Sequence, residues 1–276
     1  MAGLHALAEN AGVAFVNEVG LDPGIDHLFA YLLVDAAESA GVMGQGNAIE
    51  FVSYCGGVPA VKTDFTYKFA WTPYGVLTAL KNEARFIEGT KRKTVQKAWE
   101  DVSSMDIFGE TFEVYANRDS LPYVGEYGFG GEENLVKFVR GTLRLAGWKK
   151  AWNDIFKEVE TASPVALQAL STQLWDEYPY ADGEEDRVVL YVALSATRQD
   201  GSVWKACLSL DQKGSGWKTA MATTVSLTVA QAVTALMKGM MEPGVHAAIA
   251  DVAKCREWVA GLQKNGILVK AENVNL

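Results

Sequence analysis

The stretch Val13 to Gly41, VAFVNEVGLDPGIDHLFAYLLVDAAESAG, decides the fold class of this chain. Val13 to Val16 is a short apolar run typical of a buried strand. A turn with Gly and Pro follows over residues 20–24, and then apolar residues recur at helical spacing from Ile25 to Ala40. Because Leu4 to Asn10 also has a helical pattern, the chain opens as helix, strand and helix. This order is typical of the last unit of a parallel α/β sheet.

The turn Gly20-Leu21-Asp22-Pro23-Gly24 is the first candidate site. It follows a predicted strand, and open α/β sheets bind ligands at the carboxyl ends of their strands. Asp22 is placed to bind an ammonium group or to orient a proton. For Asp26 and His27, which begin the helix, the alternative is capping, because free N–H groups and the helix dipole favour an acidic residue there.

The next elements are a strand and a helix. Ile49 to Tyr54 has strand periodicity, which Cys55-Gly56-Gly57 interrupts, since paired glycines permit close backbone approach or positive φ. Thr72-Pro73 then opens a helix through Leu80, with Thr as the cap and Pro at the first helical position. A loop-rich region is expected from there to about residue 110.

The second half combines antiparallel strands with long helices. Thr111 to Tyr115 alternates as a strand, whereas periodicity leaves Leu135 to Leu145 as either helix or strand. The clearest hairpin pairs Arg187 to Ala196 with Ser202 to Leu210, because Asp200-Gly201 between them supplies the positive φ angles of a tight turn. Helices are predicted over 149–178, with a break near Ser163-Pro164, over 220–238 and over 247–262.

These elements together predict a fold of class α/β plus α+β. The opening residues form the remnant of a parallel sheet. The remainder forms a mixed or antiparallel sheet covered by helices. No internal repeat is visible.

Composition and charge exclude several classes of protein. The chain has 276 residues, of which 49% are hydrophobic and 21% charged, so it has the balance of a folded globular protein rather than a disordered one. A net charge of −9 argues against sequence-independent binding of nucleic acid. The short basic run Lys91-Arg92-Lys93 is expected to be a solvated loop or helix face. No apolar run approaches the ~20 residues of a membrane span.

The cysteines and histidines give no sign of a disulfide framework or a metal centre. Cys55, Cys207 and Cys255 are odd in number and far apart, which is typical of reduced thiols in a cytosol-like compartment. The three histidines lack metal-ligand spacing, so no metal is expected. Cys55 is a nucleophile only if a cationic neighbour lowers its pKa; otherwise it is a buried small residue or part of a substrate wall.

Arginines that follow or lie within predicted strands are the candidate carboxylate ligands. Arg118, in the loop segment Asn117-Arg118-Asp119-Ser120, is suited to bidentate capture of a carboxylate, or else forms a structural salt bridge. Arg140 and Arg144 share a face whether their segment is helix or strand, and form either a cationic wall or a solvated edge. No GxGxxG, Walker-type or GxSxG motif is present.

Six segments in order, NEVGLDPGIDH, SYCGGVPA, YKFAWTPYGVL, NRDSLPY, RGTLR and GWKTAMATTVSLTVAQA, resemble the successive motifs of saccharopine dehydrogenases. The resemblance covers roughly residues 13 to 265. It implies NADP-linked hydride transfer of the glutamate-forming kind, which interconverts saccharopine with aminoadipate semialdehyde plus glutamate in lysine metabolism. The partner is then a small molecule, saccharopine or glutamate, and neither nucleic acid nor a membrane.

The resemblance also assigns expected roles to individual residues. Asp22 and Cys55 are the expected catalytic residues, with Asp22 orienting or stabilising the iminium nitrogen. The substrate-binding residues implied are Tyr54, Gly57, Thr72, Asn117 and Arg118, the last as the family's carboxylate-binding arginine. The residues expected against the cofactor are Gly20, Leu21 and Pro23.

The resemblance further implies a division of the chain. Residues 1–21 would end a Rossmann-like nucleotide-binding domain, 22–211 would form the substrate-binding domain, and 212–276 would be helices packing back toward the nucleotide-binding domain. Because the family's glycine-rich half lies upstream, NADP is expected to be held mostly by a domain missing here. An upstream segment or self-association as a homodimer would cover apolar helix faces.

Several alternatives stay open at this point. The chain is either such a dehydrogenase, or an imine reductase of the same superfamily acting on a carboxynorspermidine-type substrate, or a truncated domain used only for binding or dimerisation. A cytoplasmic location is expected, or a mitochondrial one if the chain is part of a bifunctional degradative enzyme.

Overall fold

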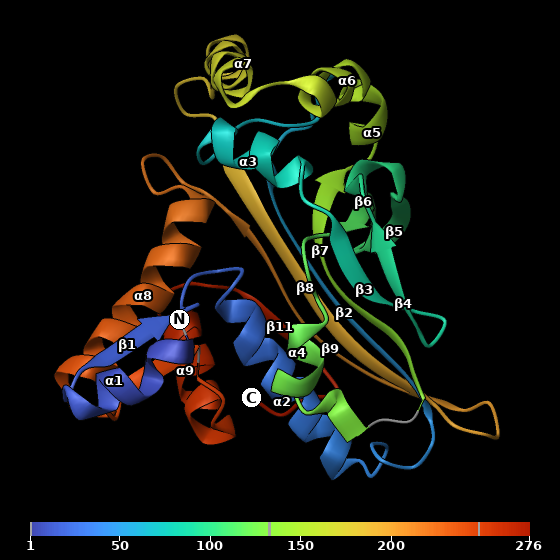
Figure 1. Ribbon diagram of the computed structural model, residues 1–276, viewed down its shortest axis with the longest axis vertical. Helices are drawn as coiled ribbons and strands as arrows, with labels where there is room; N and C mark the ends of the chain where they lie inside the picture. The colour runs from blue at the N-terminus through green and yellow to red at the C-terminus, as the bar shows by residue number, and fades with distance from the viewer. Residues whose placement is uncertain (1, 132–133, 248) are drawn as a thin grey trace.

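The structure is a computed structural model that describes residues 2–131, 134–247 and 249–276. Within these residues a long mixed sheet forms the spine of the molecule, and helices gather on it at two levels (Figure 1). A two-stranded parallel sheet lies beside the lower group of helices. The predicted class, α/β plus α+β, is confirmed.

The long sheet has the strand order β11-β9-β8-β2-β7-β3-β4, with β5 paired to β6 and β6 to β7. The pairs are antiparallel except for β2 and β7, which run parallel. Its strands are β2 (Ala48–Pro59), β3 (Ala84–Glu88), β4 (Lys91–Val95), β5 (Ser103–Ile107), β6 (Glu110–Ala116), β7 (Leu135–Leu145), β8 (Asp186–Thr197), β9 (Val203–Lys213) and β11 (Val269–Glu272).

The lower helices cover one face of this sheet. Helix α2 (Ile25–Ser39) and helix α9 (Val252–Lys264) share a core with the sheet in which Phe29, Leu32 and Leu33 are fully buried. Helix α8 (Ala220–Met237) lies beside them in Figure 1, and α4 (Pro122–Glu126) crosses in front of the sheet. Burial of these large side chains, worth about 1.5–3 kcal/mol each, is what fixes α2 on the sheet.

The upper helices enclose a second core that is rich in aromatic rings. Trp148 and Trp152 are fully buried in it, and the ring of Tyr115 stacks on Trp148 with centroids 4.9 Å apart. The helices around this core are α3 (Pro73–Leu80), α5 (Trp148–Ala151), α6 (Asn153–Thr161) and α7 (Pro164–Glu177). The two cores leave room between them at the middle of the sheet, and this is where the candidate site lies.

The small parallel sheet joins the two ends of the chain. Strand β1 (Ala14–Asn17) pairs with β10 (Gly244–Ala247), with Ala14 opposite Gly244. Helix α1 (His5–Asn10), preceded by a 3-10 turn at Ala2–Leu4, lies against it. The strand predicted from Val13 to Val16 is therefore confirmed, together with its parallel pairing.

Two predictions for the first half of the chain need correction. Strand β2 is not interrupted at residues 55–57 but continues to Pro59, because Gly56 permits the close approach of β7 rather than a change of direction. The region between Leu80 and residue 110 is not mainly loop, since it holds β3, β4 and β5. The basic run Lys91-Arg92-Lys93 opens strand β4, where its first two residues are exposed.

Segments near the C-terminus also differ from expectation. The helix predicted over 247–262 begins only at Val252, after β10, and position 248 lies outside the described residues. Among the described helices α8 alone is long and apolar enough to cross a membrane by length and composition, although the sequence predicts no apolar run of that length. Core helices of globular proteins pass the same criterion. In α8, Thr224 and Thr228 are buried, whereas Val229, Val233 and Met237 are exposed.

Candidate functional site

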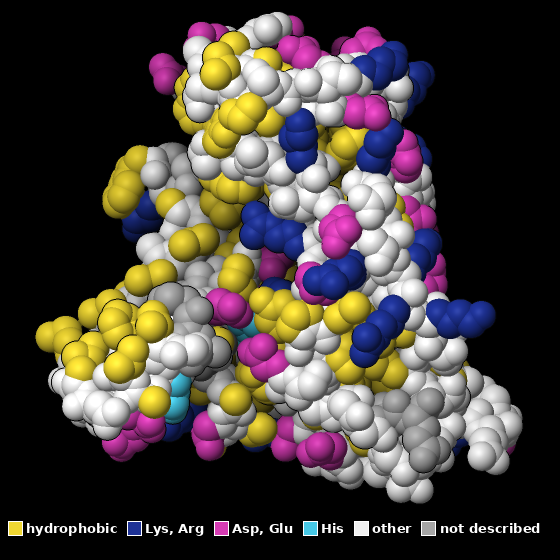
Figure 2. All heavy atoms as spheres, viewed as in Figure 1, with side chains coloured by type: hydrophobic (Ala, Val, Ile, Leu, Met, Phe, Trp, Pro, Cys, Tyr) yellow, Lys and Arg dark blue, Asp and Glu magenta, His cyan; other side chains and the backbone are white. Residues whose placement is uncertain are grey.

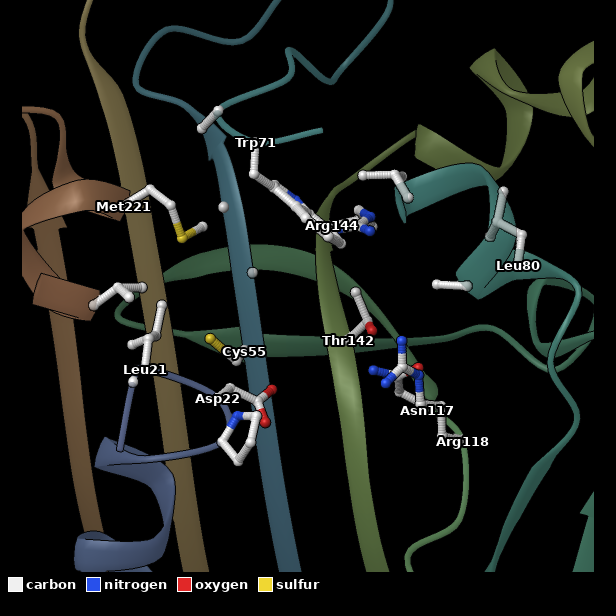
Figure 3. A pocket seen from close by; sticks show the side chains of 18 of the residues that line it. Leu21, Asp22, Cys55, Trp71, Leu80, Asn117, Arg118, Thr142, Arg144 and Met221 are labelled. Carbon is white, nitrogen blue, oxygen red and sulfur yellow. The ribbon is translucent and has the colours of Figure 1, made fainter. Parts of the chain in front are cut away.

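A cavity of about 660 Å³ opens between the two levels of helices. Figure 2 shows the molecule hollowed there, with basic and acidic side chains gathered around the opening. The lining comes from the turn after β1, from β2, β6 and β7, from α3 and from the start of α8. The residues that matter most for its chemistry are labelled in Figure 3.

The turn after β1 presents Asp22 to the cavity. Gly20 donates its N–H to the carbonyl of Pro23 at 3.0 Å, and the Asp22–Pro23 peptide is cis. At Gly24 the φ angle is +151°, and a Cβ there would meet the carbonyl oxygen of Gly20 at 2.0 Å. The glycines are thus required for a turn tight enough to point Asp22 away from the sheet and into the space seen in Figure 3.

The floor of the cavity is a row of residues in register across three strands. Cys55 on β2 pairs with Thr142 on β7, and Thr142 pairs with Tyr115 on β6. All three line the cavity. Burial, with the nearby charges of Asp22 and Asp26, raises the pKa of the Cys55 thiol well above its ordinary value, so it stays protonated at neutral pH. Cys55 is therefore chemically suited to form a wall and not to act as a nucleophile.

Arg118 provides a cationic side of the cavity from the loop after β6. Its φ of +52° is in the left-handed region, which is unusual for a residue with a side chain. The loop holds this conformation because Arg118 accepts a hydrogen bond from the Arg85 N–H, and Ser120 donates to the Arg85 carbonyl, both at 2.8 Å. The exposed Arg118 side chain has no carboxylate partner among the residues that the structure describes.

Arg144 is a second cation at the cavity, and it is buried, with 7% of its surface exposed. Its guanidinium lies over the ring of Tyr67, 4.7 Å from the centroid, and within 6 Å of the rings of Tyr115 and Trp148. Within residues 2–131, 134–247 and 249–276 it forms no ion pair, and its Nε lacks a hydrogen-bond partner. Since a buried cation is costly unless paired, Arg144 is a strong candidate to bind an anionic ligand.

Asp22 lies across the cavity from these arginines, and the pKa of its carboxyl is raised. Burial and the negative charge of Asp26 raise its pKa to about 7, although 26% of its side chain remains accessible in the cavity. Arg140 opposes this rise through an ion pair in which its Nη2 lies 3.0 Å from Asp22 Oδ1. Asp22 can therefore hold a proton near neutral pH, which suits a group that exchanges a proton with a ligand nitrogen.

Most residues predicted for the site are brought together. Eight of the ten line this one cavity, namely Gly20, Leu21, Asp22, Pro23, Cys55, Gly57, Asn117 and Arg118.

Tyr54 and Thr72, in contrast, lie outside the lining. Tyr54 neighbours Cys55 on a strand, so it points to the opposite face of the sheet, where its ring covers Gly141 and borders a different cavity. Thr72 precedes α3 as predicted, but its exposed side chain makes no capping hydrogen bond.

Other lining residues were missed or left open by the sequence. Arg144 was considered only as part of a cationic wall or a solvated edge. Thr142 and Tyr115 follow from the strand register, which the sequence alone does not give. Trp71, 43% exposed at the cavity, was not among the predicted site residues, and Met221 lies in the first turn of α8, distant in sequence from the rest of the lining.

The described residues contain one group with metal-ligand chemistry. The ligand atoms of Glu18, His27 and Glu126 lie within 4.8 Å of one another. However, His27 Nε2 already contacts the Glu18 carboxylate at 2.7 Å, and its Nδ1 contacts the Tyr127 hydroxyl at 2.7 Å. A hydrogen-bonded acid–histidine pair accounts for this arrangement without a metal.

Two helices begin at the cavity, and both use their first N–H groups internally. At α2 the Gly24 N–H binds Asp26 Oδ1 at 2.7 Å. At α8 the Ala220 and Met221 N–H groups bind the Asp186 carboxylate at 2.6 and 2.9 Å. These helix starts are therefore not free to hold a pyrophosphate. The side chains of Leu21, Met221 and Val225, which also line the cavity, are apolar.

The comparisons with known proteins agree on a family. Residues 20–267 match the family model of the saccharopine dehydrogenase C-terminal domain. The chain is 29% identical to a saccharopine dehydrogenase [NADP(+), L-glutamate-forming] of Pyricularia oryzae, over 87% of this chain and 69% of that protein. It is 31% identical to the protein of the same name from Saccharomyces cerevisiae, over 65% of this chain and 45% of that protein.

Longer relatives and a solved structure extend this picture. The chain is 37% identical to the mitochondrial alpha-aminoadipic semialdehyde synthase of Mus musculus, over 57% of this chain but 17% of that protein. The solved apo saccharopine dehydrogenase (L-Glu forming) from Saccharomyces cerevisiae superposes with a TM-score of 0.77 at 24% identity, covering 98% of this chain and 76% of that one. This superposition establishes the likeness of fold.

Proposed function

The chain belongs to the saccharopine dehydrogenase family, and on that premise we propose that its cavity binds saccharopine for NADP-linked, L-glutamate-forming dehydrogenation. In the reverse direction the same site would reduce the imine formed from aminoadipate semialdehyde and glutamate. Because the match covers only part of several relatives, the activity of a whole relative is carried over as a proposal.

The observation that supports this proposal best is the charge pattern of the cavity. Saccharopine has three carboxylates and one secondary amine. Arg118 and Arg144 are cations at the cavity without carboxylate partners among the described residues, and Asp22 lies on the turn across from Arg118 (Figure 3). Two arginines for carboxylates and one acid for a nitrogen match a polycarboxylate amino acid better than an apolar ligand or a polycation.

The proposed chemistry assigns a task to each of these groups. In the reductive direction the amine of glutamate and the aldehyde lose water to form a C=N bond. A bound nicotinamide cofactor supplies the hydride that adds to the carbon of this bond. Asp22 would hold a proton at the nitrogen, which becomes the secondary amine, while Arg118 and Arg144 fix the carboxylates so that the carbon is presented in one orientation.

The remaining predicted roles are narrower. Gly57 would leave space for the substrate, and Asn117 would add a hydrogen bond beside Arg118. Cys55 would be a wall of the pocket with a protonated thiol. For the cofactor we propose that Gly20, Leu21 and Pro23 contact only the nicotinamide end, because the helix starts at the cavity are occupied by Asp26 and Asp186.

Calorimetric titration of the chain tests the proposal. Saccharopine should bind, and lysine, which lacks two of the three carboxylates, should bind far more weakly. Carboxynorspermidine distinguishes the two candidate functions, because tighter binding of carboxynorspermidine than of saccharopine would favour the hypothesis of a related imine reductase. Binding of none of these three ligands by a folded chain would refute the proposed function.

A further inference from the structure

We propose that Arg140 is a positioning residue of this site: anchored by the buried Asp26, its guanidinium holds the Asp22 carboxyl in place, while its backbone holds the loop that carries Arg118. Arg140 does not line the cavity, so it would act through the residues that do. Its significance for catalysis rests on the proposed function, whereas the geometry is independent of it.

The side chain of Arg140 joins strand β7 to the turn after β1. One atom, Nη2, contacts Asp22 Oδ1 at 3.0 Å and Asp26 Oδ2 at 2.5 Å. The Asp26 side chain is fully buried and is fixed in turn by the Gly24 N–H at 2.7 Å. Asp22 is therefore the partly accessible end of a chain of contacts whose other end, Asp26, is buried.

The guanidinium itself has little freedom to move. It lies over the ring of Tyr123 from the α4 segment, 3.9 Å from the centroid, and its side chain is only 12% exposed. Its Nε has no hydrogen-bond partner among the residues that the structure describes, so the guanidinium is held through Nη2 and through the ring of Tyr123. A planar guanidinium fits a stacked site of this kind, whereas a lysine ammonium does not.

The backbone of Arg140 reaches the other wall. Its carbonyl accepts a hydrogen bond from the Asn117 N–H at 3.0 Å, and its N–H donates to Ser120 Oγ at 3.0 Å. These two bonds bracket Arg118. One residue thus ties the acidic turn and the cationic loop to the same point of β7, which fixes the separation of the two charges that the ligand would span.

Several titratable groups surround the Asp22–Asp26 pair and affect any titration. They come from the segment before the turn, from α2, from α4 and its end, and from β2 and β7, and they are Glu18, His27, Tyr123, Glu126, Tyr127, Cys55 and Arg144. Because two carboxyls share one guanidinium, their protons belong to the pair and the two signals need to be followed together.

The test is a carboxyl ¹³C NMR titration of the folded chain, which needs neither substrate nor cofactor. In Arg140→Met the pair should keep its shared proton to a higher pH, by about one pH unit or more, because a cation at contact distance is removed. In Asp26→Asn the Asp22 signal should titrate at a lower pH, because a negative neighbour is removed while Arg140 stays. A general loosening of the fold would not move the two variants in opposite directions.

Two further variants keep the result interpretable if Arg140→Met folds poorly. Arg140→Lys keeps the charge and should restore most of the wild-type midpoint, yet should broaden the Asp22 signal because the stacked fork is lost. Arg256→Met removes a comparable contact, to Asp35 at 2.6 Å, and should leave the pair unchanged. Unchanged midpoints in Arg140→Met and Arg140→Lys, or shifts in the same direction for Arg140→Met and Asp26→Asn, would overturn the proposal.

The outcome is separable from that of the proposed function. If the wild-type chain fails to bind saccharopine while the opposite shifts appear, the proposed substrate is wrong and the positioning role of Arg140 stands. If saccharopine binds but the opposite shifts are absent, the proposed substrate stands and the positioning role of Arg140 is wrong.

Discussion

Asp22 and Arg118 line the same cavity, one from the turn after β1 and the other from the loop after β6 (Figure 3). They are far apart in the sequence, and the sheet between them supplies the floor. The distance between the Asp22 carboxyl and the Arg118 guanidinium determines the length of the ligand that can contact both.

Arg118→Ala should weaken saccharopine binding by about tenfold to a hundredfold, because a charged hydrogen-bonded contact is worth about 1.5–3 kcal/mol. The affinity of Arg118→Lys for saccharopine should lie between those of wild type and Arg118→Ala, since the charge remains but the bidentate hydrogen bonding of the guanidinium is lost. Calorimetry on each variant measures the effect. Arg198→Ala serves as the matched control, because Arg198 does not line the cavity and its side chain hydrogen-bonds Ser202 in its own hairpin. Equal affinities for wild type and Arg118→Ala would remove Arg118 from the binding site.

Arg144→Met should separate binding from stability. Because Arg144 has no ion pair in the described parts of the chain, its replacement leaves no buried carboxylate unpaired and should change the free energy of unfolding by about 1 kcal/mol or less. Binding of saccharopine should nevertheless fall by at least about tenfold.

The comparison for Arg144 is Arg187→Met, measured by urea unfolding. Arg187 contacts Asp211 at 2.6 Å and Glu110 at 2.7 Å, so its loss should cost about 2 kcal/mol or more. If Arg144→Met were as destabilising as Arg187→Met, Arg144 would have a structural role and not a ligand-binding one.

The sequence predicted those elements whose signals are local. The hairpin of β8 and β9 was found because Asp200-Gly201 specifies its turn, and α2 because its apolar residues keep helical spacing over four turns. Strands β3 and β4 were missed because Lys91-Arg92-Lys93 reads as a charged surface, while their pairing depends on contact with β7. Segment 135–145 was undecided because tertiary pairing, not periodicity, makes it a strand.

The candidate site shows the same limit. Asp22 and Arg118 stood out because each follows a strand in a turn-rich motif. Tyr54 was predicted to contact the substrate, but its side chain lies on the other face of the sheet. The sequence does not show which face of β2 borders the cavity, so it could not distinguish Tyr54 from its neighbour Cys55. The isolated position of Arg144 could not be read from the sequence, since it depends on which aromatic rings fold around it.

Asp22→Asn should change how stability depends on pH. In the folded chain the pKa of Asp22 is raised from its ordinary 3.8 to about 7. Between these values the folded state binds the proton and the unfolded state does not, so rising pH removes stability from the wild type in this window. The asparagine variant lacks this loss and should gain on the order of 1–2 kcal/mol relative to wild type from pH 4 to pH 8, allowing for solvent screening of the accessible side chain.

Urea unfolding at several pH values measures that difference for Asp22→Asn. Glu160→Gln is a suitable control, because Glu160 does not line the cavity and pairs with Lys97 at the surface. Parallel pH profiles for wild type and Asp22→Asn would show that the Asp22 carboxyl titrates normally.

Gly56 and Gly57 are neighbours on β2, and their substitution should have different consequences, mainly for stability at Gly56 and mainly for binding at Gly57. A Cβ at Gly56 would meet the Leu143 carbonyl oxygen at 2.2 Å, and the backbone of β7 cannot withdraw without breaking the parallel pairing. Gly56→Ala should therefore destabilise the chain by about 3 kcal/mol. A Cβ at Gly57 would meet only the terminal methyl of Met221, at 2.6 Å, which can rotate aside. Gly57→Ala should cost about 1 kcal/mol or less in urea unfolding, yet should weaken saccharopine binding because the added methyl enters the cavity. A Gly57→Ala chain that binds saccharopine as tightly as wild type would show that the ligand does not reach this part of β2.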